Sequence, residues 1–206
     1  MAENPKGATQ RGSKAPLQNE SRRKIILDAA IACFEKNGPS TTIDEIAAAA
    51  NITRRTVYHY FKSKTDIWRS ATIQHACDQL LCMRAAVDHE QSFPDFVTEC
   101  TMYMIESLPK QAFHKLQTSD GLGLQIGHVY FTSSEVTTTW IDTFQPHYIS
   151  ALRARSINPE LTLDEIITWS GRVILSYVQY PDSGQNQDEI RKNINLFFTN
   201  ALRYGA

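Results

Sequence analysis

Apolar residues recur at helical spacing along most of this 206-residue chain. After a polar stretch that ends at Glu20, apolar pairs return every four positions from Ile25/Ile26 to Cys33/Phe34. Further stripes lie between residues 64 and 87, 93 and 104, 163 and 177, and 190 and 202. This spacing puts the apolar residues on one face of a helix, whereas a strand alternates at every second residue. The pattern predicts an all-α protein of about nine helices.

Local signals predict several helix ends. Asn37 and Gly38, followed by Pro39, suit a left-handed C-cap and a residue that cannot continue the helix. Thr42 precedes Glu45 with the spacing of a capping box. Ser92 and Thr162 are predicted caps of later helices, and the last helix is expected to run through residue 202.

The middle of the chain, residues 109–160, is interrupted by glycine and proline. The segment 129–141 allows a strand interpretation, because three consecutive threonines at 137–139 are poor helix formers. We prefer a helix, since a lone strand has no partner elsewhere in the sequence.

Three short helices between residues 21 and 61 predict a helix-turn-helix, with the motif at 42–61. The second helix ends in four alanines, 47–50, which let a third helix pack closely across it. Asn51 tolerates the positive φ that the turn requires. The third helix, from about Thr53, has Val57 as its one aliphatic residue. We expect Val57 to be buried and the polar and aromatic residues around it to face a DNA major groove.

The residue types of this third helix are those that bind DNA. Arginine pairs with guanine, the threonine methyl contacts the thymine methyl, and tyrosine and lysine reach phosphates. The distribution of charge also indicates that the N-terminal part binds DNA. Residues 1–70 hold 12 Lys/Arg against 7 Asp/Glu, while the remainder holds 9 against 15. The DNA-binding residues predicted on this helix are Thr53, Arg54, Arg55, Thr56, Tyr58, His59 and Tyr60.

Three domains are predicted: a flexible basic tail at 1–20, a DNA-binding domain at 21–68 and a larger helical domain at 69–206. No apolar stretch has the length of a membrane span, and the polar N-terminus lacks a signal-peptide core, so we expect a cytoplasmic protein. The four cysteines form no CxxC pair, and the sequence contains no enzyme motif. We therefore expect no metal, no cofactor and no enzymatic activity.

Two segments, 42–47 (TIDEIA) and 51–64 (NITRRTVYHYFKSK), resemble the signature of TetR-type repressors. The resemblance covers residues 21 to about 70. It implies that Thr42 and Lys64 contact phosphates and that Arg54 and Arg55 lie at base edges. Asp44 stands where the family often has a basic residue, which removes one expected DNA contact.

The resemblance also implies a homodimer, whose last two long helices form a four-helix interface with the partner. Two recognition helices would then bind a quasi-palindromic site with half-sites about one DNA turn apart. The residues expected at the interface are Ile166, Val173, Ile190, Ile194, Phe197, Phe198 and Ala201.

In this family a small molecule usually binds the helical body and releases the operator. The region 83–177 is rich in soft and aromatic side chains, which suit a hydrophobic or aromatic ligand. Alternatives are a regulator that needs no ligand or that acts as an activator through a protein partner, and, more remotely, a helical enzyme with a basic module. The candidate pocket residues are Met83, Phe96, Cys100, Met104, Phe113, Leu122, Ile126, Tyr130, Trp140, Phe144, Trp169 and Tyr177.

Overall fold

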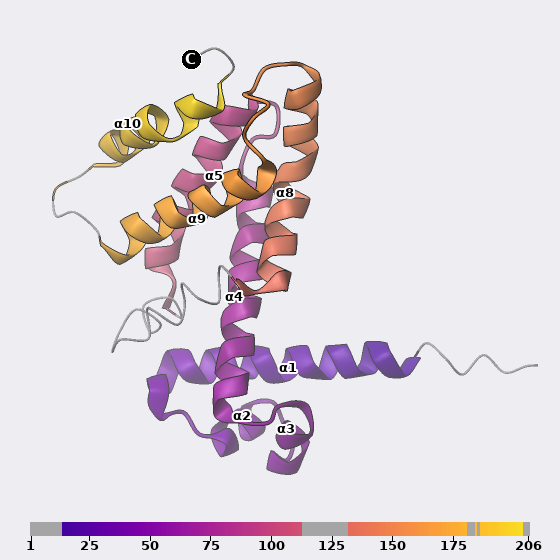
Figure 1. Cartoon of the computed structure of the whole chain (residues 1–206). Coiled ribbons are helices and arrows are strands. Elements are labelled where there is room, and N and C mark those ends of the chain that lie inside the picture. The colour runs from indigo at the N-terminus through magenta and orange to yellow at the C-terminus, as the bar shows by residue number, and fades with distance from the viewer. Residues whose placement is uncertain (1–13, 113–131, 181–183, 185, 204–206) are drawn as a thin grey trace, which may run out of the picture. The chain divides into compact units, whose positions relative to one another are not determined.

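The structure is a computed structural model that describes residues 14–112, 132–180, 184 and 186–203, and its regular elements in these ranges are helices (Figure 1). The all-α prediction is therefore confirmed. The chain divides into two compact units, residues 1–71 and 72–206, which we call the head and the body. In the described ranges, no helix combines the length and the apolar character needed to cross a membrane.

The head contains α1 (Lys14–Asn37), a short 3-10 helix η1 (Gly38–Ser40), α2 (Ile43–Ala49) and α3 (Arg54–Tyr60). Helix α4 (Lys64–Ala86) begins in the head and continues into the body. Helix α1 starts inside the segment 1–20 that was expected to be a tail, so this boundary is corrected to before Lys14. The added residues include good helix formers such as alanine, leucine and glutamate, which favour extension of the helix.

Local signals set the helix ends in the head as predicted. Gly38 has a φ of 61° just after α1, and Asn51 has a φ of 53° after α2. The amide of Asn51 donates to the carbonyl of Ala48 and the amide of Ile52 to that of Ala47, at 3.1 and 2.9 Å. These two bonds are a Schellman motif, in which the left-handed residue satisfies the last carbonyls of the helix.

The body is built around α5 (Phe93–Ser107), which contacts α8 (Ser134–Arg153), α9 (Leu163–Gln179) and α10 (Gln187–Phe197). The 3-10 helix η2 (Leu108–Lys110) follows α5, and η3 (Thr199–Leu202) follows α10. Most residues of α5 are buried on all sides, as expected for a helix at the centre of a core. The predicted caps Ser92 and Thr162 start α5 and α9, and Thr162 forms a capping box with Glu165.

The segment that allowed either a strand or a helix lies in α8 from Ser134 onwards. Ser133 caps this helix by accepting a hydrogen bond from the amide of Val136. Thr139 and Thr143 each donate a hydroxyl hydrogen bond to the carbonyl four residues earlier, at 2.8 Å. These bonds satisfy the hydroxyls within the helix, so the threonines are accommodated there.

The last helix is shorter than predicted. α10 ends at Phe197, and residues 199–202 form the 3-10 helix η3 instead of continuing the α-helix. The reason is tertiary: the buried Thr199 hydroxyl is 3.0 Å from the hydroxyl of Thr98 on α5. The amide of Asn158 also donates to the carbonyl of Leu202 at 2.9 Å. The chain after α10 therefore turns to meet α5 and the α8–α9 connection.

Candidate DNA-binding site

Helix α3 buries one side chain and exposes most of the others. Val57 has no exposed surface and belongs to the core of the head. Thr53, Arg54, Arg55 and His59 are exposed, and Tyr58 keeps 44% of its surface accessible. Thr56 and Tyr60 are half-buried. This arrangement leaves a polar and aromatic face available for a partner, as predicted for a recognition helix.

The α2–α3 unit is held by short, well-capped connections. Thr42 and Glu45 form a capping box at the start of α2, and Ile46 and Ala47 of the same helix are buried. Thr53 caps α3: its hydroxyl accepts from the amide of Thr56 at 3.2 Å and lies 2.9 Å from the Thr56 hydroxyl. These contacts fix the start of α3 before any partner binds.

Arg23 of α1 connects three parts of the head. Its guanidinium donates to the carbonyl of Tyr60 at the end of α3 at 3.2 Å and to the Ser70 hydroxyl on α4 at 2.9 Å. The same group lies 4.2 Å from the ring centroid of Phe61, a cation–π contact. Sequence analysis did not identify Arg23, because its partners lie 37 and 47 residues away.

Arg54 at the start of α3 is already engaged within the head. Its Nη1 donates to Asp44 Oδ2 on α2 at 2.7 Å, and its Nη2 lies 3.5 Å from the Tyr58 hydroxyl. The hydroxyl of Tyr58 and the carboxylate of Asp44 raise the pKa of Arg54, which keeps the guanidinium charged. Sequence analysis treated Asp44 as a lost contact, whereas the structure gives its carboxylate a partner on α3.

Two predicted phosphate contacts also have partners in the head. The Thr42 hydroxyl is 2.8 Å from Glu45 Oε2, within the capping box. Lys64 Nζ donates to the carbonyls of Pro39 and Thr41 at 2.7 and 3.1 Å. Both side chains are exposed, so a phosphate would share or replace these bonds.

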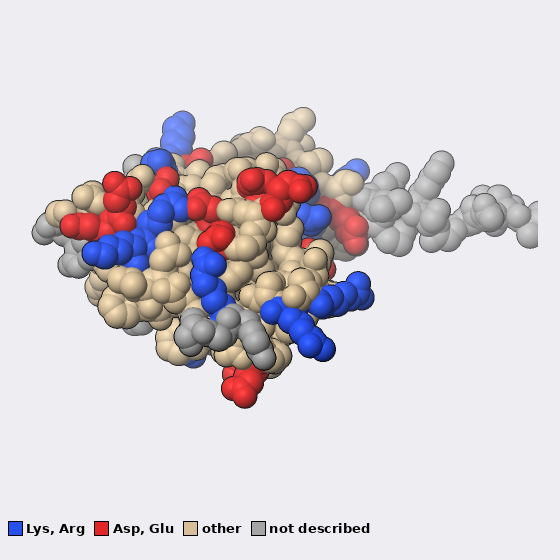
Figure 2. All heavy atoms as spheres, turned by 90° about the horizontal axis from the view of Figure 1, so that it is seen from above, with Lys and Arg blue, Asp and Glu red and all other residues tan. Residues whose placement is uncertain are grey.

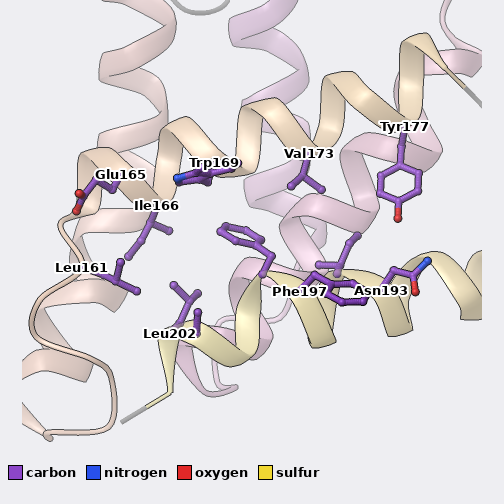
Figure 3. Close-up of a pocket in the computed structure, with 12 residues that line it drawn as sticks. Leu161, Glu165, Ile166, Trp169, Val173, Tyr177, Asn193, Phe197 and Leu202 are labelled. Atoms are coloured by element: carbon purple, nitrogen blue, oxygen red, sulfur yellow. The ribbon is translucent and has the colours of Figure 1, made fainter. Parts of the chain in front are cut away.

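The body contains an apolar groove between α9 and α10 with a volume of about 440 Å³. Trp169, Val173 and Tyr177 of α9 line this groove together with Asn193 and Phe197 of α10 (Figure 3). Phe197 is 83% exposed and Trp169 is 54% exposed, which is unusual for large apolar side chains.

The predicted interface residues fall into two groups. Ile166 and Ile194 are buried in the core of the body and also line the groove. The remaining residues, on α9, on α10 and just after it, keep accessible surface: Val173, Ile190, Phe197, Phe198 and Ala201. Leu196 and Tyr180, at 52% and 79% exposed, were not predicted.

Of the candidate pocket residues, six pack together in the core of the body: Met83, Phe96, Cys100, Met104, Trp140 and Phe144. Tyr177 is half-buried and Trp169 is exposed, and both line the α9–α10 groove. Trp169 and Tyr177 thus lie outside the buried cluster that holds the six core residues, and the predicted ligand pocket stays a prediction. The other four, Phe113, Leu122, Ile126 and Tyr130, lie outside the described residues.

Charge on the face drawn in Figure 2 is mixed, with basic and acidic side chains next to one another. A nucleic-acid site needs a concentration of positive charge. That face shows no such concentration of positive charge, and the assignment of DNA binding rests on α3.

The fold and the exposed face of α3 define a helix-turn-helix DNA-binding protein. Residues 26–71 match the family model described as bacterial regulatory proteins, tetR family. This part of the chain is therefore a DNA-binding domain of the TetR type. This family consists of DNA-binding regulators rather than enzymes.

Curated relatives are similar over about a quarter of the chain. The chain is 39% identical over 56 residues to the HTH-type transcriptional regulator AcrR of Shigella flexneri, which covers 27% of this chain and 26% of that protein. It is 40% identical over 53 residues to a probable acrEF/envCD operon repressor of Escherichia coli K12, covering 25% and 24%. The matched region thus spans about a quarter of each relative.

The fold is similar over nearly the whole chain. The regulator FadR of Bacillus subtilis, solved in complex with stearoyl-CoA, has a TM-score of 0.54 and covers 83% of this chain and 96% of that one. Sequence identity is 15%, so this likeness concerns the fold.

Proposed function

We propose that this regulator is a repressor that binds a quasi-palindromic operator as a homodimer and is released by a small hydrophobic or aromatic ligand. The observation that carries the DNA-binding part is the arrangement of α3, with Val57 buried and arginine, threonine, tyrosine and histidine side chains outward. A relative that is 40% identical over 53 residues is named as a probable operon repressor, which supports repression over activation.

The proposed operator contacts divide by chemistry. Arg54 and Arg55 pair with base edges, and Thr56 contacts a thymine methyl. Tyr58, His59 and Tyr60, together with Thr42, Thr53 and Lys64, contact the backbone or neighbouring bases. Arg55 is exposed and has no ion-pair partner among the described residues, so its guanidinium is available to a base without breaking a contact.

The proposed dimer covers the α9–α10 groove with a second copy of the chain. Phe197 and Trp169 border this groove and would lose their exposed surface in such an interface. Burial of apolar surface contributes about 25 cal/mol per Å², so these side chains favour association. A dimer also presents two copies of α3 to two half-sites, as a quasi-palindrome requires.

The proposed ligand binds against the soft side chains of the body core. FadR of Bacillus subtilis, which shares the fold, holds stearoyl-CoA, a ligand with a long apolar chain. Release from the operator requires that the ligand favour the body conformation in which DNA affinity is low.

The DNA-binding proposal is tested by selecting bound duplexes from a random library with the full chain at about 150 mM salt. We expect enrichment of a sequence with two related half-sites, and Arg55→Ala is expected to weaken its binding by about 1–3 kcal/mol. Absence of any enriched sequence would contradict the proposal.

The ligand is tested separately by thermal shift with acyl-CoAs and planar aromatic compounds. A ligand at one hundred times its Kd adds about 2.7 kcal/mol of stability. It should also release the selected duplex. Stabilisation by none of the compounds would instead favour a regulator that works without a small molecule.

A further inference from the structure

The guanidinium of Arg54 is held between two side chains of the head, and one of them is an acid. Asp44 lies ten residues earlier, in the first turn of α2, and accepts a hydrogen bond from Arg54 Nη1 at 2.7 Å. Tyr58, one turn further along α3, is 3.5 Å from Nη2, and its ring centroid is 5.6 Å from Arg54 Cζ. These two contacts favour one direction of the Arg54 side chain before DNA binds.

This ion pair has little value for the stability of the head. Both side chains are well exposed, 56% for Arg54 and 64% for Asp44, and exposed pairs contribute little in water. Two neighbouring acids, Asp44 and Glu45, also occupy the first turn of α2, where Glu45 forms the capping box. Asp44 is therefore not needed to cap the helix, and a role outside folding stability remains open to it.

An acid beside the recognition helix has a cost for DNA binding. Affinity for any duplex comes largely from neutralising phosphates, and a carboxylate close to the backbone opposes this. The charge of Asp44 reduces affinity for every sequence alike. An acid at this position is an advantage only if it improves the discrimination between DNA sequences.

Its number of N–H donors allows Arg54 to keep Asp44 and bind a base at the same time. A guanidinium carries five N–H donors. Asp44 takes one and Tyr58 takes at most one, so three remain, and O6 and N7 of guanine require two. Displacement of water from the groove strengthens the ion pair, because charges interact more strongly in a lower dielectric.

We propose that Asp44 is a specificity-determining residue of the operator site, which orients Arg54 toward one guanine and lowers affinity for all other duplexes. The proposal rests on the DNA-binding function proposed above. It gives a role to the acid at a position where the sequence alone suggested only a missing contact.

The test uses the full chain and the duplex that the wild type selects, with a random-sequence duplex of equal length for comparison. Asp44→Ala is expected to bind the random duplex more tightly and to reduce the ratio of selected to random affinity by at least about fivefold. In a new library selection, Asp44→Ala and Arg54→Ala are expected to lose preference at the same guanine.

Three further variants separate positioning from charge. Asp44→Asn keeps an oxygen that accepts from Arg54, so it is expected to retain more of the guanine preference than Asp44→Ala. In the Arg54→Ala background, Asp44→Ala should cause no further loss of preference at that base. Glu35→Ala removes one exposed acid from α1 of the same head and should leave the affinity ratio unchanged.

Two results would overturn the proposal. If Asp44→Ala raised the affinity for both duplexes equally and left the base preferences unchanged, Asp44 would act only through its negative charge. Loss of preference at different bases in Asp44→Ala and Arg54→Ala would show that the two residues act independently. Failure of the wild type to select any duplex is a separate outcome, which would remove the function proposed above.

Discussion

His147 Nε2 on α8 and His89 Nδ1, in the connection between α4 and α5, lie 3.0 Å apart. The other nitrogen of His89 is 2.7 Å from the carbonyl of Arg84, a contact that requires a proton on Nε2. The nitrogens facing each other therefore share one proton, and the pair carries at most one positive charge while the bond remains. The ring of His147 also lies on that of buried Phe96, with centroids 4.1 Å apart.

Acid is expected to destabilise the body through this pair. Burial, the charge of His89 and the charge of Arg84 lower the pKa of His147 below its ordinary value of 6.5. A lowered pKa means that the unfolded chain binds the proton more readily than the folded one. The stability that neutral His147 gives the body is thus fully present above pH 6.5. It is lost as the pH falls through the lower pKa that His147 has in the folded state.

Thermal unfolding measured from pH 8 to pH 5 checks this. His147→Gln keeps a hydrogen-bonding group without titrating, so its Tm should fall less with acid than that of the wild type. An identical pH profile for the two proteins would exclude His147 as the cause.

Val57→Ala is expected to destabilise the head by about 1–3 kcal/mol, because it leaves a cavity in a fully buried site. Tyr58→Ala is the matched control one residue further along α3. Its side chain is 44% exposed, so stability should change by about 0.5 kcal/mol or less. Urea denaturation of the full chain measures both. Similar losses for the two variants would mean that α3 is not oriented as described.

Lys64→Ala is expected to weaken binding to all duplexes and to flatten the salt dependence of affinity, as for a lost phosphate contact. It should also lower the stability of the head by about 1 kcal/mol, since Nζ donates to two carbonyls. Lys62→Ala removes an exposed lysine two residues earlier and should cost less stability. A change of sequence preference at constant salt slope would contradict the phosphate role.

Phe197→Asp is expected to give monomers in place of the proposed dimer, because it places a charge at the most exposed apolar side chain of the α9–α10 groove. Sedimentation velocity measures this directly. Leu81→Asp on α4 replaces another exposed apolar residue, 51% accessible, and should leave the dimer intact. Dimers that persist in Phe197→Asp would place the interface elsewhere.

The sequence predicted best those features that depend on neighbouring residues. The capping box of Thr42, the positive φ of Asn51 and the burial of Val57 follow from residues within a few positions of one another. Helix and turn chemistry acts over this range, so the helix-turn-helix was recognisable from the sequence alone.

Features that depend on distant residues were missed. The contact between Arg54 and Asp44 spans ten residues and depends on the angle between α2 and α3. The exposed face of Trp169 became evident only from the packing of α9 on α5. Helical periodicity shows that a residue lies on a stripe, but not whether its own chain or another molecule covers that stripe.

The hydrogen bond between Thr98 and Thr199 joins residues 101 positions apart. At a translation rate of about 5–20 residues per second, the ribosome needs roughly 5–20 s to make Thr199 after Thr98 has been added. During this interval the apolar surface of α5 lacks the helices that later cover it. The hydrogen bond from Arg23 to Ser70 in the head, by contrast, joins residues only 47 positions apart. The nascent body is therefore the part of the chain most exposed to chaperones and to aggregation while synthesis proceeds.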